Sequence, residues 1–242
     1  AYDCYTAKYI DNAGVDIVLI GDSLAMVALG YENTNSVGVE EMKIFTRAVS
    51  NGVEHAMVVT DMPFLSYHTS VEDAVTNCGQ MIKLGANGVK IEGGSEYIIS
   101  VVDRLTQVGI PVMGHIGFTP QSENVIGGHV IQGKTEDAVE ALLRQAKQLE
   151  ASGAFSIVLE MVPESVGKYI TKNISIPTIS CGGGKFCDGF VMVCDDLLGK
   201  FTDFTPKFAR KYANLAEIIE NCAVRFNQDV KSGKYPLENE VY

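Results

Sequence analysis

The 242-residue sequence predicts an α/β protein with a parallel sheet, in the form of a (β/α)8 barrel. Short apolar, β-branched runs alternate with amphipathic helical stretches from one end of the chain to the other. The runs are continuously apolar, which is typical of strands covered on both faces. No linker, charge run or low-complexity segment divides the chain, so we expect a single catalytic domain over residues 1–242. An open, doubly wound sheet is the alternative.

Seven strands are visible as apolar runs, and a closed barrel of this kind needs eight. The predicted strands cover residues 15–20, 56–60, 88–91, 110–113, 155–159, 176–179 and 190–193. Residues 3–14 have the pattern of a helix, and the strand before that helix would end at Ala1 and Tyr2. We therefore expect the first strand of the barrel to lie mostly upstream of Ala1.

Two helices are indicated by their end signals. Ser70 and Thr135 each precede an amphipathic stretch as N-cap residues, and Gly85 and Gly153 follow those stretches as stop signals. A last helical stretch is expected over residues 206–230.

Composition excludes several classes of protein. No apolar stretch approaches the roughly 18 residues that a membrane span requires. The net charge of −11 argues against nucleic acid as a partner, because phosphate binding needs a basic surface. The six cysteines form no CxxC pair, which indicates reduced core thiols in a cytoplasmic protein; a thiol cluster of Cys181, Cys187 and Cys194 is the alternative.

Polar residues stand where the predicted strands end. In a barrel the catalytic groups project from the carboxyl ends of the strands, so these positions are the first candidates for chemistry. Each one alone is often a turn former or a helix cap, and only their combination indicates a site. They are Asp22, Ser23, Asp61, Lys90, Glu92, His115, Glu160, Cys181, Asp195 and Asp196.

Three carboxylates on adjacent strands predict a metal site. Asp22, Asp61 and Glu92 would repel one another unless a divalent cation lay among them. Oxygen ligands without paired histidines or thiolates favour Mg²⁺, which keeps positions open for water and a chelating substrate. Lys90 points a positive charge at the same mouth, where it would neutralise a substrate carboxylate; a salt bridge with Glu92 is the alternative.

Glu160 and His115 are candidates for moving a proton or stabilising charge. Glu160 stands apart from the acid cluster, and an apolar pocket there would suit a general base. His115 would orient an oxyanion or satisfy a hydrogen bond of the core. The run from Gly182 to Lys185 lacks the spacing of a phosphate-binding loop, so we interpret it as a close backbone approach in a tight turn.

With these residues assembled, the sequence resembles the ketopantoate hydroxymethyltransferase family of barrel enzymes. The matching blocks run in order through the chain and include AGVDIVLIGDSLAMVALGY, VVTDMPFLSY, GANGVKIEGG, GHIGFTPQS and LEMVPE, of which the last two are highly specific. The chain departs from the family's usual pattern near the mouth, at Ala25, His129, Val130, Cys181 and Phe190.

The resemblance implies transfer of a hydroxymethyl group from 5,10-methylenetetrahydrofolate to 3-methyl-2-oxobutanoate, which yields 2-dehydropantoate for pantothenate biosynthesis. It implies that Asp22, Asp61 and Glu92 bind Mg²⁺, that Ser23 and Lys90 hold the oxo acid, and that Glu160 accepts a proton. It also implies a homo-oligomer, with a decamer as the family's form.

The mechanism that we expect passes through an enolate held on Mg²⁺, with Glu160 removing the C3 hydrogen and Lys90 and His115 stabilising charge on the ketone oxygen. One alternative is a Mg²⁺-dependent carbon–carbon lyase of the isocitrate lyase and phosphoenolpyruvate mutase kind. Another is a catalytically silent barrel that serves as a scaffold.

Overall fold

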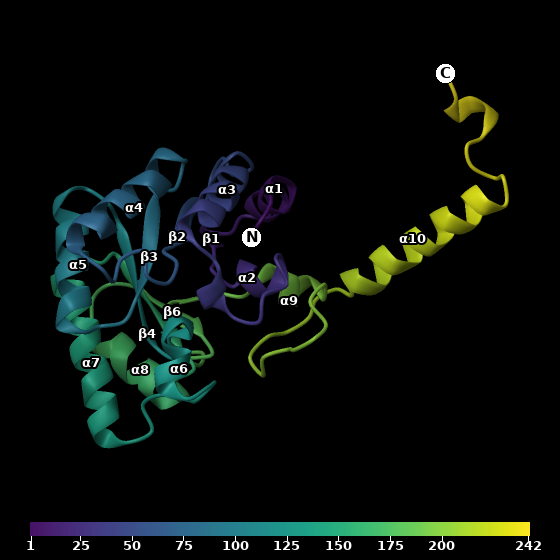
Figure 1. Cartoon of the computed structure of the whole chain (residues 1–242). Helices are drawn as coiled ribbons and strands as arrows, with labels where there is room; N and C mark the ends of the chain where they lie inside the picture. Colours follow the sequence, from purple (N-terminus) through teal and green to yellow (C-terminus); the bar gives the residue numbers. More distant parts are fainter. The chain divides into compact units, whose positions relative to one another are not determined.

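Seven parallel strands form one sheet, and their order in space is their order along the chain (Figure 1). The strands of this computed structural model, which describes residues 1–242, are β1 (Ile17–Ile20), β2 (Met57–Asp61), β3 (Gly88–Glu92), β4 (Val112–Gly117), β5 (Ser156–Glu160), β6 (Thr178–Cys181) and β7 (Gly189–Phe190). Each predicted strand is therefore present, with shifts of a few residues at the ends. In a doubly wound sheet the strand order reverses at one point within the sheet. The order here runs from β1 to β7 without a reversal, so the doubly wound alternative was wrong.

Helices connect the strands and pack on the outer side of the sheet (Figure 1). Those of the first compact unit, Ala1–Val191, are α1 (Cys4–Asn12), α2 (Leu24–Val27), α3 (Val39–Ser50), α4 (Val71–Lys83), α5 (Glu96–Gln107), α6 (Glu123–Ile126), α7 (Glu136–Ala151) and α8 (Glu164–Asn173), with 3₁₀ turns η1 (Thr34–Ser36) and η2 (Pro120–Ser122). The second unit, Met192–Tyr242, contains α9 (Cys194–Leu198), α10 (Leu215–Lys231) and η3 (Glu238–Glu240).

The sheet is curled around a central apolar cluster. Val59, Met113 and Val158 form this cluster from β2, β4 and β5. Residues from both edges of the sheet pack against it, namely Ile17 and Leu19 of β1 and Val191 after β7. The predicted parallel α/β fold is confirmed as a seven-stranded half-barrel, whereas the eighth strand predicted upstream of Ala1 is not part of the structure.

The predicted end signals of the helices are confirmed. Ser70 accepts a hydrogen bond from Asp73 N at the start of α4, and Thr135 accepts one from Ala138 N at the start of α7. Gly85 and Gly153 adopt the left-handed backbone that ends these helices, with φ of +107° and +87°.

The prediction for the last helix was wrong at its start. α10 begins at Leu215 and not at residue 206, because the dihedral angles of Asn214 (φ −124°, ψ 70°) are not helical. The last strand is also displaced, since Gly189 and Phe190 pair with Ile179 and Ser180.

The run of glycines after β6 makes the close backbone approach that the sequence predicts. A Cβ on Gly184 would lie 2.6 Å from Glu164 Cβ, and one on Gly183 would lie 2.9 Å from Leu159 O. Gly184 also has a positive φ of +89°, which favours glycine. The turn therefore lets this loop pack tightly on the start of α8.

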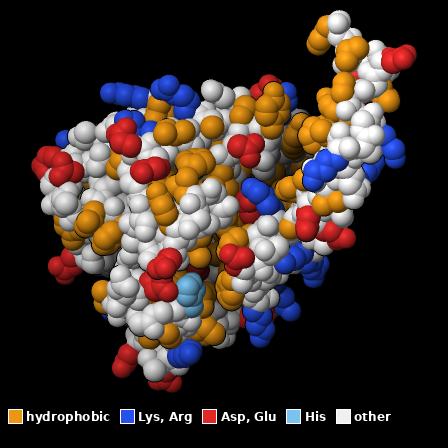
Figure 2. Space-filling view, turned by 45° about the vertical axis from the view of Figure 1, so that its right-hand side comes forward, with side chains coloured by type: hydrophobic (Ala, Val, Ile, Leu, Met, Phe, Trp, Pro, Cys, Tyr) orange, Lys and Arg blue, Asp and Glu red, His pale blue; other side chains and the backbone are white.

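Three further features concern membrane-spanning helices, the cysteines and the surface charge. No helix combines the length and apolar character that crossing a bilayer would demand. All six cysteines are free thiols. On the face shown in Figure 2, acidic and basic side chains are interspersed with hydrophobic ones.

A buried carboxylate joins α1 to the beginning of β2. Asp11 accepts hydrogen bonds from the backbone N–H groups of Glu54, His55 and Ala56, at 2.9, 3.2 and 2.7 Å. These bonds favour the charged carboxylate and lower the pKa of Asp11 to about 2.

We predict that Asp11→Asn destabilises the fold above pH 4 and has a smaller effect in acid. A depressed pKa adds stability that is present above the unfolded pKa of about 3.9 and is lost as the pH falls toward 2. Urea unfolding of both proteins between pH 3 and pH 7 measures this difference. A stability difference that does not change over this range would contradict the role of the charge.

Candidate active site

The apolar cluster in the curled sheet positions the polar residues above it. Val59 is followed two residues later by Asp61, Met113 by His115, and Val158 by Glu160. Because side chains alternate between the faces of a strand, each polar residue shares the inner face with the apolar residue below it. The carboxyl end of the half-barrel thus carries a polar layer on a hydrophobic base.

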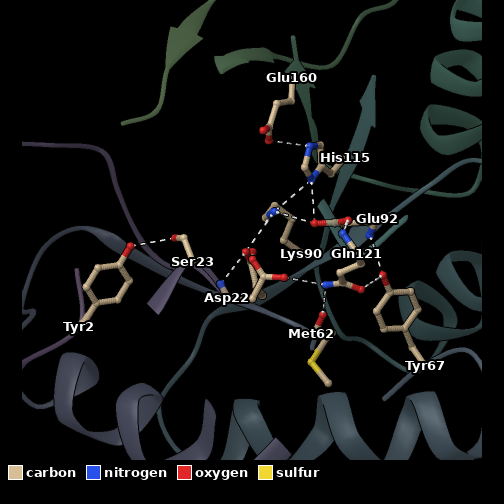
Figure 3. A network of polar contacts seen from close by, with 11 residues as sticks. Tyr2, Asp22, Ser23, Met62, Tyr67, Lys90, Glu92, His115, Gln121 and Glu160 are labelled. Atoms are coloured by element: carbon tan, nitrogen blue, oxygen red, sulfur yellow. Dashed lines mark hydrogen bonds and ion pairs between the residues drawn. The ribbon is translucent and has the colours of Figure 1, made fainter. Parts of the chain in front are cut away.

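Asp61, Lys90 and Glu92 form the buried centre of this layer; Lys90 and Glu92 are labelled in Figure 3. Lys90 Nζ lies 3.1 Å from Asp61 Oδ2 and 3.9 Å from Glu92 Oε1. Asp22, in the turn after β1, joins them through its backbone, because Asp22 N donates to the same Asp61 Oδ2 at 3.1 Å. The salt bridge considered for Lys90 therefore exists, and its shorter contact is with Asp61.

His115 links this centre to Glu160. Its Nδ1 lies 3.1 Å from Lys90 Nζ and 3.4 Å from Glu92 Oε1, and its Nε2 lies 3.1 Å from Glu160 Oε2. The sequence led us to expect that Glu160 stands apart from the acid cluster, and this expectation was wrong: His115 connects the two. The reason is that strand register gives no information on side-chain reach, and the imidazole spans the distance from Glu92 to Glu160 (Figure 3).

Burial and neighbouring charges both shift the pKa values of the three buried acids. Burial raises the pKa of Asp22 well above its usual value, and the charges of Asp61 and Glu92 raise it further. Burial also raises the pKa of Asp61, against the effect of Lys90. In Glu92 the effect of burial is outweighed by His115 and Lys90, so its pKa is lowered. The site thus holds more negative charge than its own cations neutralise easily.

The two basic groups remain charged in this setting. Burial lowers the pKa of Lys90, but Asp61, Glu92 and Asp22 together raise it above its usual value. Burial and Lys90 likewise oppose the charged form of His115, whereas Glu92 and Glu160 raise the pKa of His115 to about 9. His115 is therefore an imidazolium at neutral pH, with a carboxylate on each side.

Two buried carboxylate oxygens have no hydrogen-bond partner, namely Asp61 Oδ1 and Glu92 Oε1. Glu92 Oε1 still has His115 Nδ1 and Lys90 Nζ as ionic neighbours, so Asp61 Oδ1 is the unpaired oxygen. An unpaired anionic oxygen in a buried site is costly, and a cation would remove the cost. The structure has no group of three His, Cys, Asp or Glu side chains already arranged around one point. Mg²⁺ does not need such a group, because it keeps several waters and binds through one or two carboxylates plus its substrate. The donor set therefore fits Mg²⁺.

Ser23 lies at the edge of this site. Its Oγ is 2.8 Å from the hydroxyl of Tyr2, a residue that sequence reasoning did not single out (Figure 3).

Cys181 lies at the end of β6 and pairs in register with Glu160. Burial, and to a lesser degree the charge of Glu160, raises the pKa of the Cys181 thiol well above its usual value. Cys181 is therefore an uncharged thiol.

Asp195, Asp196 and His129 have contacts of their own. Asp195 and Asp196 belong to α9 in the second unit, where Asp195 pairs with Lys200 at 2.9 Å, so they do not end a strand. His129 stacks on Phe118 with ring centroids 5.1 Å apart, and its Nδ1 lies 3.2 Å from Glu123.

Sequence reasoning missed Gln121 and Tyr67. Gln121 lies in η2, in the loop after β4, and its side-chain Nε2 donates to Asp22 Oδ2 at 2.9 Å. The Tyr67 hydroxyl donates to Gln121 Oε1 at 2.7 Å. Both residues lie outside strand ends, and their only signal was membership of matching blocks: Gln121 of GHIGFTPQS and Tyr67 of VVTDMPFLSY.

Comparison with known structures shows the fold. The half-barrel is similar to 2,3-dimethylmalate lyase, a member of the PEP mutase/isocitrate lyase superfamily, with a TM-score of 0.61 and 13% identity over 100% of this chain and 84% of that chain. It is also similar to phosphonopyruvate hydrolase in complex with oxalate and Mg²⁺, with a TM-score of 0.60 and 13% identity over 99% and 86% of the two chains.

Comparison of sequences shows the family. The model of ketopantoate hydroxymethyltransferase matches residues 1–238. The chain is 55% identical to 3-methyl-2-oxobutanoate hydroxymethyltransferase of Thermotoga neapolitana over 242 residues, which is 100% of this chain and 89% of that protein. It is 49% identical to the enzyme of the same name from Clostridium botulinum, over 100% of this chain and 88% of that protein. With these matches over its whole length, the chain belongs to the ketopantoate hydroxymethyltransferase family.

Proposed function

We propose that this protein is a 3-methyl-2-oxobutanoate hydroxymethyltransferase, which transfers a one-carbon unit from 5,10-methylenetetrahydrofolate to the oxo acid and forms 2-dehydropantoate. The full-length relatives of that name support this proposal. The observation that carries it is the line of contacts from Asp61 through Lys90 and His115 to Glu160. This line joins a group of acids suited to a cation with a separate carboxylate suited to a proton.

Mg²⁺ is the proposed metal, held by Asp22, Asp61 and Glu92. The unpaired Oδ1 of Asp61 supports this assignment, and so does the Mg²⁺ in the complex of the fold neighbour phosphonopyruvate hydrolase. When bound, the ion would act as a Lewis acid on the oxo acid and make its C3 hydrogen more acidic.

Lys90 and Ser23 would hold the oxo acid. The Lys90 ammonium, whose pKa the surrounding carboxylates raise above its usual value, would attract the substrate carboxylate. The Ser23 hydroxyl, fixed by Tyr2, would donate a hydrogen bond at the edge of the mouth. Asp22, Asp61 and His115, which the contacts of Lys90 and Asp61 bring together, would complete the substrate site.

Glu160 would accept the proton from C3. Its side chain is 17% exposed, more than any other acid of the contact line, so an incoming substrate would reach it. His115 Nε2 contacts Oε2 of Glu160 and so fixes the direction of the carboxylate. Once C3 has lost its proton, it would attack the methylene carbon of the folate as the bonds from that carbon to the folate nitrogens break; water would supply the hydroxyl group, and tetrahydrofolate would leave. The positive charge of His115 would stabilise the negative charge on the ketone oxygen.

Four further features are part of this proposal. The strand pattern supports closure of the sheet into an eight-stranded barrel, and the absence of a linker supports a single domain over residues 1–242. The cysteine pattern supports a cytoplasmic location, and the family resemblance supports assembly into a homo-oligomer. The lyase alternative rests on fold neighbours of 13% identity, and a shared fold does not carry an activity with it.

We predict that Glu160→Gln slows proton removal by at least about 100-fold, because an amide cannot accept the proton. Deuterium exchange at C3 of 3-methyl-2-oxobutanoate, followed by NMR in D₂O with Mg²⁺ and without folate, isolates this step. Glu136→Gln, an exposed position in the first turn of α7, is the control. Exchange that continues unchanged in Glu160→Gln would remove Glu160 from this role.

We also predict that Lys90→Met destabilises the metal-free protein by about 3 kcal/mol, since removing one partner of a buried ion pair leaves an uncompensated charge. Urea unfolding in EDTA measures the effect. Lys147→Met, an exposed position on α7, serves as the control and should change stability little. Equal stability of the two variants would show that Lys90 does not balance the acids.

A further inference from the structure

Gln121 is a buried glutamine whose polar groups are all engaged by the candidate site. Its Nε2 donates to Asp22 Oδ2 and to Met62 O, both at 2.9 Å. Its Oε1 accepts from the Tyr67 hydroxyl at 2.7 Å, and its backbone N–H donates to Glu92 Oε2 at 3.1 Å. One residue of the loop after β4 therefore joins groups that follow β1 and β2 to the last residue of β3 (Figure 3).

The direction of each of these hydrogen bonds is fixed. The carbonyl of Met62 can only accept, so the amide nitrogen of Gln121 must face it. The amide oxygen then faces Tyr67, whose hydroxyl must donate to it and whose oxygen accepts from Glu92 N at 3.3 Å. The second amide hydrogen is thereby directed at Asp22 Oδ2.

Gln121 also selects which carboxylate oxygens the protein itself holds. It occupies Oδ2 of Asp22 and Oε2 of Glu92, while Asp61 Oδ2 is held by Asp22 N and Lys90. The opposite oxygens of Asp61 and Glu92, Oδ1 and Oε1, have no hydrogen-bond partner. Glu92 Oε1 still has His115 Nδ1 at 3.4 Å and Lys90 Nζ at 3.9 Å as ionic neighbours, so Asp61 Oδ1 is the oxygen left without a partner.

We propose that Gln121 is the positioning residue of the cation site. By holding one oxygen each of Asp22 and Glu92, it turns their other oxygens toward a divalent ion, and Tyr67 locks it in the orientation that does so. This inference rests on the proposed function, because it assigns Gln121 a role toward the metal proposed there. Partners of metal ligands typically change metal affinity by 10- to 100-fold when they are removed.

The test is the affinity of the metal-free protein for Mn²⁺, measured by EPR titration of free Mn²⁺ at neutral pH. Gln121→Met keeps the approximate length of the side chain and removes its three side-chain hydrogen bonds, with Asp22 Oδ2, Met62 O and the Tyr67 hydroxyl, while the backbone N–H bond to Glu92 Oε2 stays. We expect about tenfold weaker binding. Gln148→Met, an exposed position on α7, is the matched control and should bind as the unchanged protein does. Circular dichroism and the unfolding midpoint of each variant report whether the fold is intact.

Tyr67→Phe is the second variant, because it deletes only the hydroxyl that locks the amide. We expect a weakening of several-fold, and this variant decides the question if Gln121→Met does not fold. In steady-state assays of either variant, the Mn²⁺ concentration for half-maximal rate should rise while kcat at saturating Mn²⁺ changes little, which a general loss of structure would not produce.

The outcomes separate the inference from the proposed function. In one outcome the unchanged protein binds Mn²⁺ and Asp61→Asn does not, which supports the metal site. If folded Gln121→Met and Tyr67→Phe then bind Mn²⁺ as tightly as the unchanged protein does, the role of Gln121 is refuted and the metal site stands. If the unchanged protein itself binds no Mn²⁺, the metal site of the proposed function fails, and the inference fails with it.

Discussion

The concentration of negative charge at the mouth of the half-barrel is the constraint on which the rest of the structure depends. Asp22, Asp61 and Glu92 are all buried there, and Glu160 adds a fourth carboxylate at the end of the same contact line. Lys90 and His115 are the two basic groups within this line. Isolated charges do not persist in a protein interior, so the arrangement is stable only because each carboxylate has a cation or an N–H donor beside it.

The fold solves this problem by stacking two layers. The apolar cluster of Val59, Met113 and Val158 fills the base of the curled sheet, and the polar layer begins two residues later on the same strands. Buried apolar packing thus supplies the stability, while the ends of the strands supply the chemistry. The free-energy cost of burying the carboxylates is confined to the ends of the strands. The tight glycine turn after β6 and the Asp11 contacts before β2 hold the surrounding connections in place.

The sequence predicts the strands and most of the site because both follow from a simple rule. Continuous apolar runs mark the strands, and polar residues that end them mark the mouth, which led to Asp22, Asp61, Lys90, Glu92, His115 and Glu160. The bridge from His115 to Glu160 could not be predicted, because it depends on side-chain reach between strands. Gln121 was missed for another reason: an uncharged residue in a loop has no periodic or electrostatic signal, and its four contacts come from residues distant in sequence. The start of α10 depends on the local backbone of Asn214, which the helical pattern does not encode.

Anomalous diffraction from crystals of the full chain grown with Mn²⁺ and 3-methyl-2-oxobutanoate tests the central claim most directly, because it shows which oxygens surround the ion. The account predicts a single Mn²⁺ at the mouth that is coordinated by carboxylate oxygens of this cluster, with Asp61 Oδ1 and Glu92 Oε1 among the candidates, and by the oxo acid. Asp22 and Asp61 directed into separate regions, with no ion and no oxo acid between them, would contradict it.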